Sequence, residues 1–369
     1  MAFTVLVIGG YGNFGRIICR HLARAEGIEV IAAGRNLAPL QALAAQFGIR
    51  HWQGDAHGSG FVQALRELAV NLVIHTGGPF QGQGRAVAEH CIEAGVHYCD
   101  LADCRHFVNS IGALDAAARA EGVVVLSGCS SVPSLSAALL DEYRAPFKRI
   151  DRIEHGISSS AKMPGLATVE GVLAYAGQPI EQRRAGQPHP VPGWLGLERR
   201  QLHGLGWRWL GNVDVPDMDL FGERYGATDL VFKAGPGLAA GAWANAALAQ
   251  ARRWGLVRDS APWARRLHRL GLAFERFGDG LSAMYLQAQG EGHAGQPLRL
   301  NILLSARNDR GPEIPSCASV ALALKMAAGY QPAAGARPCV GEITVAEYLA
   351  AIDARDDIHL SVHYDGAGQ

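Results

Sequence analysis

The chain has 369 residues, with 34 basic and 34 acidic side chains and no formal net charge at pH 7. That length suits two domains, each large enough to bury a core of its own. The balanced charge excludes a field over the whole surface that would gather nucleic acid or acidic lipid, so a charged partner must be met locally. Neither nucleic acid nor a membrane is therefore expected as a partner.

The opening residues and the cysteines favour a cytoplasmic protein. MAFTVLVIGG starts a strand-like run almost at once and lacks the basic region and cleavage site of a signal peptide. Seven cysteines, an odd number, fit reduced thiols better than a disulfide framework. The most apolar later stretch, residues 230–250, contains Lys233, Pro236 and several glycines and makes a poor membrane span.

Residues 1–128 alternate short β-rich runs with helical segments. The expected strands are FTVLVIG, IEVIAAG, IRHWQGD, NLVIHTG, VHYCDLAD and VVVLSG. They recur at a spacing of roughly 20–25 residues, and parallel neighbours need a crossover helix between them. The pattern predicts an α/β fold with a Rossmann-type doubly wound parallel sheet over residues 1–130.

The rhythm changes after residue 128. PSLSAALLDEY predicts a helix with Pro133 in its first turn, and RIDRIEHGISSS predicts a strand. Residues 176–227 are rich in Gly, Pro and Trp, whereas 240–277 are helical and rich in Arg. Strands are expected at LSAMYLQAQGEG and PLRLNILLSARND, and helices at ASVALALKMAAG and VAEYLAAIDA. We expect a second α+β domain at 131–369 for substrate binding and dimerisation, whose C-terminal helices can return to the first domain.

The motif IGGYGNFGR, residues 8–16, contains GxGxxG between the first strand and the first helix. Its glycines permit a tight turn and close approach of the backbone to a pyrophosphate, which the helix N-terminus faces. A purely structural glycine turn is the alternative. The residues expected to bind a dinucleotide here are Gly10, Tyr11, Gly12, Asn13, Phe14 and Gly15.

The end of the second strand indicates which dinucleotide binds. An acidic residue there would accept a bond from the 2′-hydroxyl of NAD, but this chain has Arg35 followed by Asn36. An arginine favours a 2′-phosphate, so NADP(H) is the expected cofactor. A solvated loop arginine is the alternative. After the third strand, Asp55 is placed to touch the adenine, or to serve as an ordinary helix cap.

The fourth strand ends in NLVIHTGGPFQGQG, residues 71–84. In an open parallel sheet, ligands bind outside the carboxyl ends of the strands near the switch in strand order, and this strand belongs beside the first. Thr76, Gly77 and Gly78 would let the backbone lie against the ribose and nicotinamide, with Pro79 and Phe80 fixing the loop. Because Gly-Pro is turn chemistry by itself, a structural turn is the alternative.

Residues 89–106, EHCIEAGVHYCDLADCRH, concentrate three His, three Cys and two Asp. The cysteines lack the close pairing of a structural zinc site, so no metal is expected. Tyr98, Asp100 and Asp103 lie at or near the carboxyl end of the fifth strand and are the candidates for catalytic proton transfer. A purely structural hydrogen-bonding role is the alternative. Cys129, after the sixth strand, is either near the same crevice or simply a small buried residue.

Other motifs of known binding or catalytic sites are absent, or they have a simpler structural explanation. The arginine pairs at 183–184, 199–200, 252–253 and 265–266 favour a solvated helix face or subunit interface over a carboxylate site. YRAPFK around Tyr143 is no Tyr-x-x-x-Lys pair. The chain has no G-x-S-x-G elbow, P-loop or H-E-x-x-H.

Four segments together resemble the NADP-binding domain of the saccharopine dehydrogenase-like oxidoreductases. They are VLVIGGYGNFG, AAGRN, TGGPFQGQGRAVAEHCIEAGVHYCDLAD and SGCSSVPSLS. The resemblance covers about the first 140 residues. It implies a Rossmann domain, a second domain that closes over the cofactor and often makes a homodimer, and hydride transfer to or from a C=N or C=C bond. It places the diphosphate at the glycine loop, the 2′-phosphate at Arg35 and Asn36, and the substrate near Tyr98 and Asp100.

The expected function is that of a cytoplasmic NADP(H)-dependent oxidoreductase acting on a C=N, C=C or C=O group of a small molecule. No residues that recognise an amino-dicarboxylic substrate can be named, so the saccharopine reaction itself is not expected. The alternative from another class is a non-catalytic NADP(H)-binding redox sensor that docks on a partner. A metalloenzyme built on the His/Cys cluster is the third interpretation.

Overall fold

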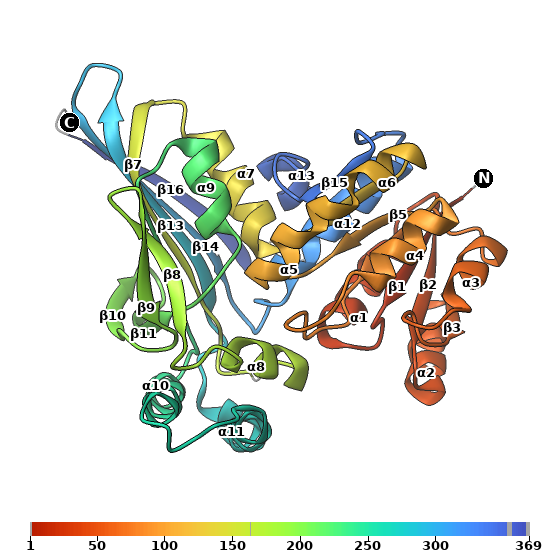
Figure 1. Ribbon diagram of the computed structural model, residues 1–369, viewed down its shortest axis with the longest axis horizontal. Coiled ribbons are helices and arrows are strands. Elements are labelled where there is room, and N and C mark those ends of the chain that lie inside the picture. Colours follow the sequence, from red (N-terminus) through yellow and green to blue (C-terminus); the bar gives the residue numbers. More distant parts are fainter. Residues whose placement is uncertain (1, 163, 353–355, 367–369) are drawn as a thin grey trace. The chain divides into compact units, whose positions relative to one another are not determined.

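The computed structural model describes residues 2–162, 164–352 and 356–366, and Figure 1 shows their arrangement into helices and strands. The chain divides into two compact units. Unit 1 comprises Met1–Ala138 and Pro312–Asp353, and unit 2 comprises Leu139–Gly311 and Ala354–Gln369. Unit 1 therefore extends past residue 130 and takes back a segment from the C-terminal part of the chain.

Unit 1 is built on a parallel sheet of seven strands in the order β15-β6-β5-β4-β1-β2-β3. The strands are β1 (Phe3–Ile8), β2 (Ile28–Gly34), β3 (Arg50–Gln53), β4 (Leu72–His75), β5 (His97–Asp100), β6 (Val124–Ser127) and β15 (Gly335–Pro338). The six strands predicted from the sequence are confirmed, and so is the pairing of the fourth with the first. The seventh strand, β15, was not predicted; it comes from far along the chain and pairs with β6.

The helices of unit 1 connect these strands and cover the sheet. They are α1 (Asn13–Leu22), α2 (Leu37–Phe47), α3 (Phe61–Glu67), α4 (Ala86–Ala94), α5 (Arg105–Ser110), α6 (Asp115–Ala120), α12 (Glu313–Ala327) and α13 (Val345–Ala350). Because helices cover both faces, β4 and β6 are buried along their whole length. The strand order reverses between β1 and β4, so the switch point lies between the loops that follow these two strands.

Unit 2 is built on a larger mixed sheet in the order β10-β11-β12-β7-β13-β14-β16, with β8 and β9 off this path. Its strands are β7 (Phe147–Ser158), β8 (Pro179–Arg184), β9 (Gln187–Pro192), β10 (Glu198–Leu202), β11 (Gly206–Asn212), β12 (Asp229–Gly235), β13 (Ser282–Gly292), β14 (Pro297–Ala306) and β16 (Ile358–Gly366). Helix α7 (Ser136–Tyr143) begins in unit 1 and ends in unit 2. The other helices of unit 2 are α8 (Leu166–Leu173), α9 (Asp217–Tyr225), α10 (Ala239–Arg253) and α11 (Ala261–Phe274). β7 and β12 are parallel neighbours.

The structure refines several expectations about the second half of the chain. The regular part of the expected helix PSLSAALLDEY is α7, and the chain is kinked just before this segment, where Val132 has extended backbone angles. The Gly, Pro and Trp-rich stretch contains the four strands β8 to β11 and helix α9, which the sequence did not resolve. The closing helix ends at Ala350, and positions 353–354 of the expected helix lie outside the described residues.

Within 2–162, 164–352 and 356–366, no helix is both long and apolar enough to cross a bilayer.

Candidate functional site

The loop between β1 and α1 has the geometry expected of a phosphate-binding turn. A Cβ on Gly15 would lie 2.2 Å from the carbonyl oxygen of Gly9, so only glycine allows α1 to start this close to the strand. The N–H of Gly12 donates to the same Gly9 carbonyl at 2.8 Å and closes the turn. No side chain caps α1 at Gly12, which leaves first-turn N–H groups for an anion.

The ends of β2 and β3 lie next to this loop. The ring of Tyr11 packs on Gly34, where a Cβ would lie 2.6 Å from its Cε1 atom. Arg35 and Asn36 follow and are exposed. Asp55 is also exposed, and one of its carboxylate oxygens accepts the His57 N–H at 3.0 Å. This bond closes a local turn and does not cap a helix, because the N-cap of the next helix is Gly60. The adenine contact of Asp55 stays a prediction.

The loop after β4 is held in place by its own side chains. Thr76 donates its hydroxyl to the carbonyl of Ile8 at 2.8 Å, which fastens the end of β4 to the end of β1. Gln83, which the sequence did not single out, donates through Nε2 to the carbonyls of Gly77 at 2.9 Å and Pro79 at 2.6 Å. Phe80 is buried in a small cluster with Ala102, Phe107 and Val108. The loop is therefore a braced surface beside the glycine turn.

His75, the last residue of β4, is a second residue that the sequence analysis missed. Its side chain is buried, and its Nδ1 atom lies 3.1 Å from the Tyr98 hydroxyl. Its Nε2 atom lies close to Gly77, because a Cβ built on Gly77 would be 3.1 Å from it. Burial, assisted by the nearby His57, lowers the pKa of His75 to about 3, so the ring is neutral at physiological pH. The sequence pattern that could have indicated His75 is a polar residue at the end of an apolar strand, just before glycines.

Asp100 fastens the carboxyl end of β5 to that of β6. It is completely buried, and its Oδ1 atom accepts hydrogen bonds from Ala102 N at 2.9 Å, Ser127 Oγ at 3.0 Å and Gly128 N at 2.9 Å. Burial raises the pKa of Asp100 to about 6, although these three donors and the nearby Tyr98 hydroxyl lower it. These bonds are the structural role that the sequence left open.

Tyr98 and Asp103 have different environments. Tyr98 is fully buried among core residues of unit 1 such as Phe61 and Cys91, and burial raises the pKa of its phenol well above the ordinary value. Asp103 is half-buried, and desolvation raises its pKa while a hydrogen bond from Gln81 lowers it. Of the three catalytic candidates, Asp103 alone has a partly exposed side chain.

The cysteine-rich segment does not assemble a metal site within the described ranges of the chain, since no three ligand-type side chains of 89–106 converge there. Cys129 is buried, and its backbone N–H donates to the Asp100 carbonyl at 2.7 Å. Its thiol contacts those of Cys99 and Cys339, which are buried as well. Cys129 is therefore an interior residue of unit 1, in agreement with the simpler of its two interpretations.

One group of ligand-type atoms does converge, between α1 and α12: His21, Glu313 and Cys317. His21 Nε2 lies 2.7 Å from Glu313 Oε2, and the guanidinium of Arg20 pairs with the other carboxylate oxygen. Burial would raise the pKa of Glu313, but the bonds from His21 and Arg20 outweigh it and hold the pKa below its ordinary value. The guanidinium of Arg20 already neutralises the Glu313 carboxylate. The group is therefore better described as an ion-pair clamp than as a metal site.

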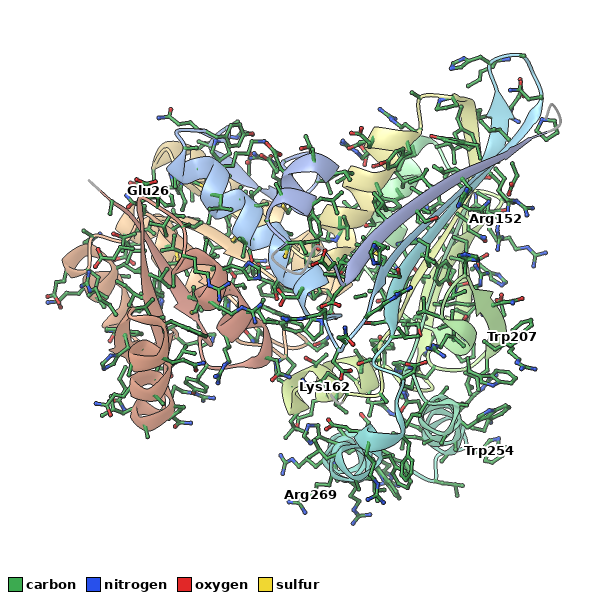
Figure 2. All side chains as sticks on the ribbon, turned by 180° about the vertical axis from the view of Figure 1, so that it is seen from behind. Glu26, Arg152, Lys162, Trp207, Trp254 and Arg269 are labelled. Atoms are coloured by element: carbon green, nitrogen blue, oxygen red, sulfur yellow. The ribbon has the colours of Figure 1, made fainter. Side chains whose placement is uncertain are left out.

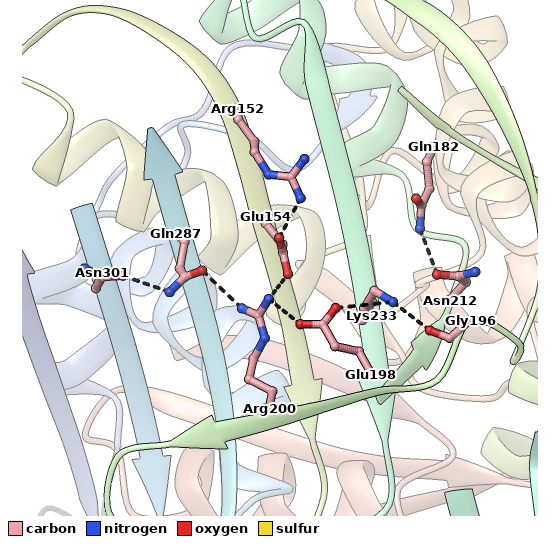
Figure 3. A network of polar contacts seen from close by, with 10 residues as sticks. All are labelled: Arg152, Glu154, Gln182, Gly196, Glu198, Arg200, Asn212, Lys233, Gln287 and Asn301. Atoms are coloured by element: carbon pink, nitrogen blue, oxygen red, sulfur yellow. Dashed lines mark hydrogen bonds and ion pairs between the residues drawn. The ribbon is translucent and has the colours of Figure 1, made fainter. Parts of the chain in front are cut away.

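In unit 2, polar side chains form a continuous network across one face of the sheet (Figure 3). Arg200 on β10 pairs with Glu154 on β7, donates to Glu198 at 3.0 Å and to Gln287 at 3.1 Å, and lies over the ring of Tyr285. The network continues through a 2.8 Å bond from Gln287 to Asn301. Arg200 is thus mostly buried on a strand and paired with two carboxylates, which corrects the expectation of a solvated helix face for this arginine.

The comparisons with known proteins bear on unit 1 first. Residues 5–126 match the family described as the saccharopine dehydrogenase NADP binding domain. This stretch lies in unit 1, makes up about a third of the chain, and is similar to that domain. The resemblance expected from the sequence is confirmed over these residues, and the NADP-binding domain gives the protein a nicotinamide dinucleotide cofactor.

Two solved structures share the fold of nearly the whole chain. Apo saccharopine dehydrogenase (L-Glu forming) from Saccharomyces cerevisiae is 12% identical, with a TM-score of 0.68 over 99% of this chain and 100% of that one. Homospermidine synthase from Legionella pneumophila, solved with NAD, is 11% identical, with a TM-score of 0.63 over 99% and 91%. At this identity the likeness shows the fold alone, and it confirms a Rossmann-type unit followed by an α+β unit.

Curated relatives match part of the chain. Putative trans-acting enoyl reductases from two strains of Mycobacterium tuberculosis are 31% identical over 141 residues. The match covers 36% of this chain and 33% of each relative, so it spans about a third of their length.

Proposed function

We propose that the protein is an NADP(H)-dependent oxidoreductase that transfers a hydride to or from a C=C, C=N or C=O group of a small molecule. The observation that carries this proposal is the uncapped start of α1 at Gly12, next to the braced loop Thr76–Phe80. A nicotinamide cofactor bound there supplies or accepts the hydride. The chain's own residues supply the binding surface and the proton.

The preference for NADP over NAD rests on Arg35. Its exposed side chain follows β2 directly, where it can meet a 2′-phosphate with two parallel hydrogen bonds. The test is a fluorescence titration of the purified protein and of Arg35→Ala with NADPH and NADH in parallel. Arg50→Ala is the matched control, because Arg50 is an exposed β3 arginine paired with Glu29.

We expect Arg35→Ala to weaken NADPH binding by roughly tenfold to a hundredfold, the value of one lost charge-assisted pair. NADH binding should stay unchanged in both variants. Equal affinity of the wild-type protein for the two cofactors would contradict the preference. No binding of either would refute the proposed function.

The proton candidates divide into two roles. Asp103, half-buried beside the Phe80 loop through its Gln81 partner, is the candidate for direct contact with substrate or an ordered water. Tyr98 and Asp100 are positioning residues that act through His75, whose ring lies between the Tyr98 hydroxyl and Gly77. Asp103→Asn should lower kcat, whereas Tyr98→Phe should shift the pH profile of turnover; full activity with an unchanged profile in both would remove these residues from the mechanism.

Turnover separates the enzyme from the alternative of a redox sensor. The relatives' name favours enoyl compounds as the first substrates to test, followed by imines and carbonyl compounds. An enzyme should consume NADPH with at least one of these classes. A sensor should bind both redox forms and consume neither. We also propose that the protein is cytoplasmic and forms a homodimer. The molar mass from light scattering, measured as the protein elutes from a size-exclusion column, would test the homodimer.

A further inference from the structure

Helices α10 and α11 of unit 2 and the turn between them expose large apolar side chains. In the turn, 70% of Trp254 and 76% of Leu256 are exposed to solvent. On and after α11, Leu270 is 58% exposed and Phe277 is 61% exposed. Figure 2 shows Trp254 and Arg269 on the outer side of these two helices. Such a concentration of exposed apolar side chains marks an interaction surface rather than a chance exposure.

Helix α11 and the 3-10 turn Glu275–Phe277 that follows it present different side chains in different directions. Ala264 is buried and Leu267 and Gly271 are half-buried, and this is the side on which α11 packs against α8. A second stripe, at helical spacing, is exposed and apolar: Trp263, Leu270, Phe274 and Phe277. A third stripe carries the exposed arginines Arg265, Arg269 and Arg276, of which Arg265 also lies 3.6 Å from the carboxylate of Glu170 on α8. The helix is thus anchored on one narrow side and amphipathic over the rest of its surface.

The charge of this region departs from that of the whole protein. Residues 239–277 contain seven arginines and only two carboxylates, Asp259 and Glu275, a net charge of +5 in a chain whose total is 0. Two of these arginines lie over aromatic rings of the same surface, Arg266 over Trp263 at 5.1 Å and Arg276 over Phe277 at 4.8 Å. Their apolar stems add to the apolar surface while the guanidinium groups stay at its rim.

We propose that the α10–α11 surface, residues 239–277, binds the surface of an anionic lipid bilayer. Helices with Trp, Phe and Leu on one side and arginines on another lie in the membrane interface, with the rings at headgroup depth and the arginines on lipid phosphates. The expectation of no membrane partner rested on the balanced charge of the whole chain. The structure gathers the local excess of arginine onto one surface together with the exposed aromatic residues.

A second copy of the chain fits this surface less well. A two-fold contact would place the same surface on itself, so the seven arginines of each copy would face those of the other with only Asp259 and Glu275 of each copy to pair them. An anionic bilayer offers the opposite charge and an apolar layer beneath it.

The test is sedimentation of the full-length protein with vesicles of phosphatidylcholine alone and with 30% phosphatidylglycerol. We expect binding to the anionic vesicles and little to the neutral ones, with binding reduced by 0.5 M NaCl. Changing Arg265, Arg269 and Arg276 together to Gln should lower the partition coefficient by about 100-fold, because each arginine near an anionic surface contributes about fivefold. Trp254→Ser with Leu256→Ser should lower it by at least about tenfold.

Trp207→Ser is the control, since Trp207 is 52% exposed but lies on β11 outside this surface, and it should bind as the wild type does. Thermal unfolding and NADPH binding should stay unchanged in all variants, which separates this inference from the proposed function. Absence of binding to anionic vesicles would overturn the proposal. So would binding that the serine variants leave intact, or a loss of dimer mass in those variants without vesicle binding, which would assign the surface to a second copy.

Discussion

The two sheets of the molecule use polar side chains in opposite ways. In unit 1 the central strands β1, β4 and β6 are buried along nearly their whole length, and the polar groups stand where strands end, as His75 and Asp100 do. In unit 2 the strand β7 carries Arg152 and Glu154 within its length, on a face that other charged residues cover.

The difference follows from what covers each sheet. A parallel sheet with helices on both faces has no room for charge inside, so its chemistry is confined to the carboxyl edge. The mixed sheet of unit 2 covers its polar face with the β10–β11 hairpin, whose Arg200 and Glu198 complete the ion pairs. The polar side chains around Arg200 in unit 2 therefore pair with one another, whereas the polar groups of unit 1 stand at the strand ends where we propose that the cofactor binds.

Gly15→Val should have the largest effect on the carboxyl edge of the unit 1 sheet, where we propose that the cofactor binds. The new side chain has to occupy the position 2.2 Å from the Gly9 carbonyl oxygen, which forces α1 away from β1. We expect loss of NADPH binding by more than about 100-fold and a decrease of about 3 kcal/mol or more in the free energy of unfolding. Titration and chemical denaturation measure the two effects. Gly112→Ala, where a Cβ meets nothing within 4 Å, should change neither.

Asp100→Ala tests the fastening of β5 to β6. It leaves the donors of Ala102, Ser127 and Gly128 buried without an acceptor, and we expect a loss of about 2–3 kcal/mol in denaturation experiments. Asp100→Asn keeps an acceptor oxygen. Its free energy of unfolding should therefore remain within about 1 kcal/mol of the wild-type value at pH 7.5.

The pH dependence of the Asp100→Asn comparison has a definite sign. Because the folded pKa of Asp100 is raised to about 6, the ionised carboxylate opposes folding at neutral pH, and the wild type gains stability as the pH falls from about 6 towards 4. Asp100→Asn lacks this gain, so its stability relative to the wild type should decrease over that interval. A difference that stays constant with pH would show that Asp100 does not titrate there.

Glu313→Gln tests the clamp between α1 and α12. The buried carboxylate loses its ion pair with Arg20 and its charge-assisted contact with His21, and we expect a loss of about 2 kcal/mol at pH 7. The folded pKa of Glu313 is depressed, so the wild type should lose this advantage as the pH falls below about 4.5. Glu29→Gln, from the exposed pair with Arg50, is the control and should cost less than about 0.5 kcal/mol.

Glu154→Gln in unit 2 should have the smallest effect. Arg200 keeps its contacts with Glu198 and Gln287, so we expect a loss of about 1 kcal/mol and no change in NADPH affinity. Glu291→Gln, which removes the exposed pair with Lys148, should lower the free energy of unfolding by less than about 0.5 kcal/mol. A change in cofactor affinity with either variant would contradict the separation between a ligand edge in unit 1 and a self-satisfied network in unit 2.

Much of unit 1 could be predicted because its signals are local. The run before Gly10, the GxGxxG spacing and the alternation of apolar strands with helices are each readable within about 25 residues. Unit 2 was harder, because β8 to β11 are short strands rich in Gly, Pro and Arg. Their pairing with one another and with β12 is not contained in any single segment.

The sequence by itself determined the parallel sheet, the position of its glycine loops and the resemblance to a dinucleotide-binding family, because strand periodicity and turn chemistry depend on neighbouring residues. The tertiary structure decided the rest. It brought His75 to Tyr98, returned Gly335–Pro338 to the sheet of unit 1, and gathered the arginines and aromatic side chains of α10 and α11 on one surface. Some of these arrangements bring together residues that are distant in sequence. Others place residues that are neighbours in sequence on different sides of a helix. Only packing of the whole chain selects them.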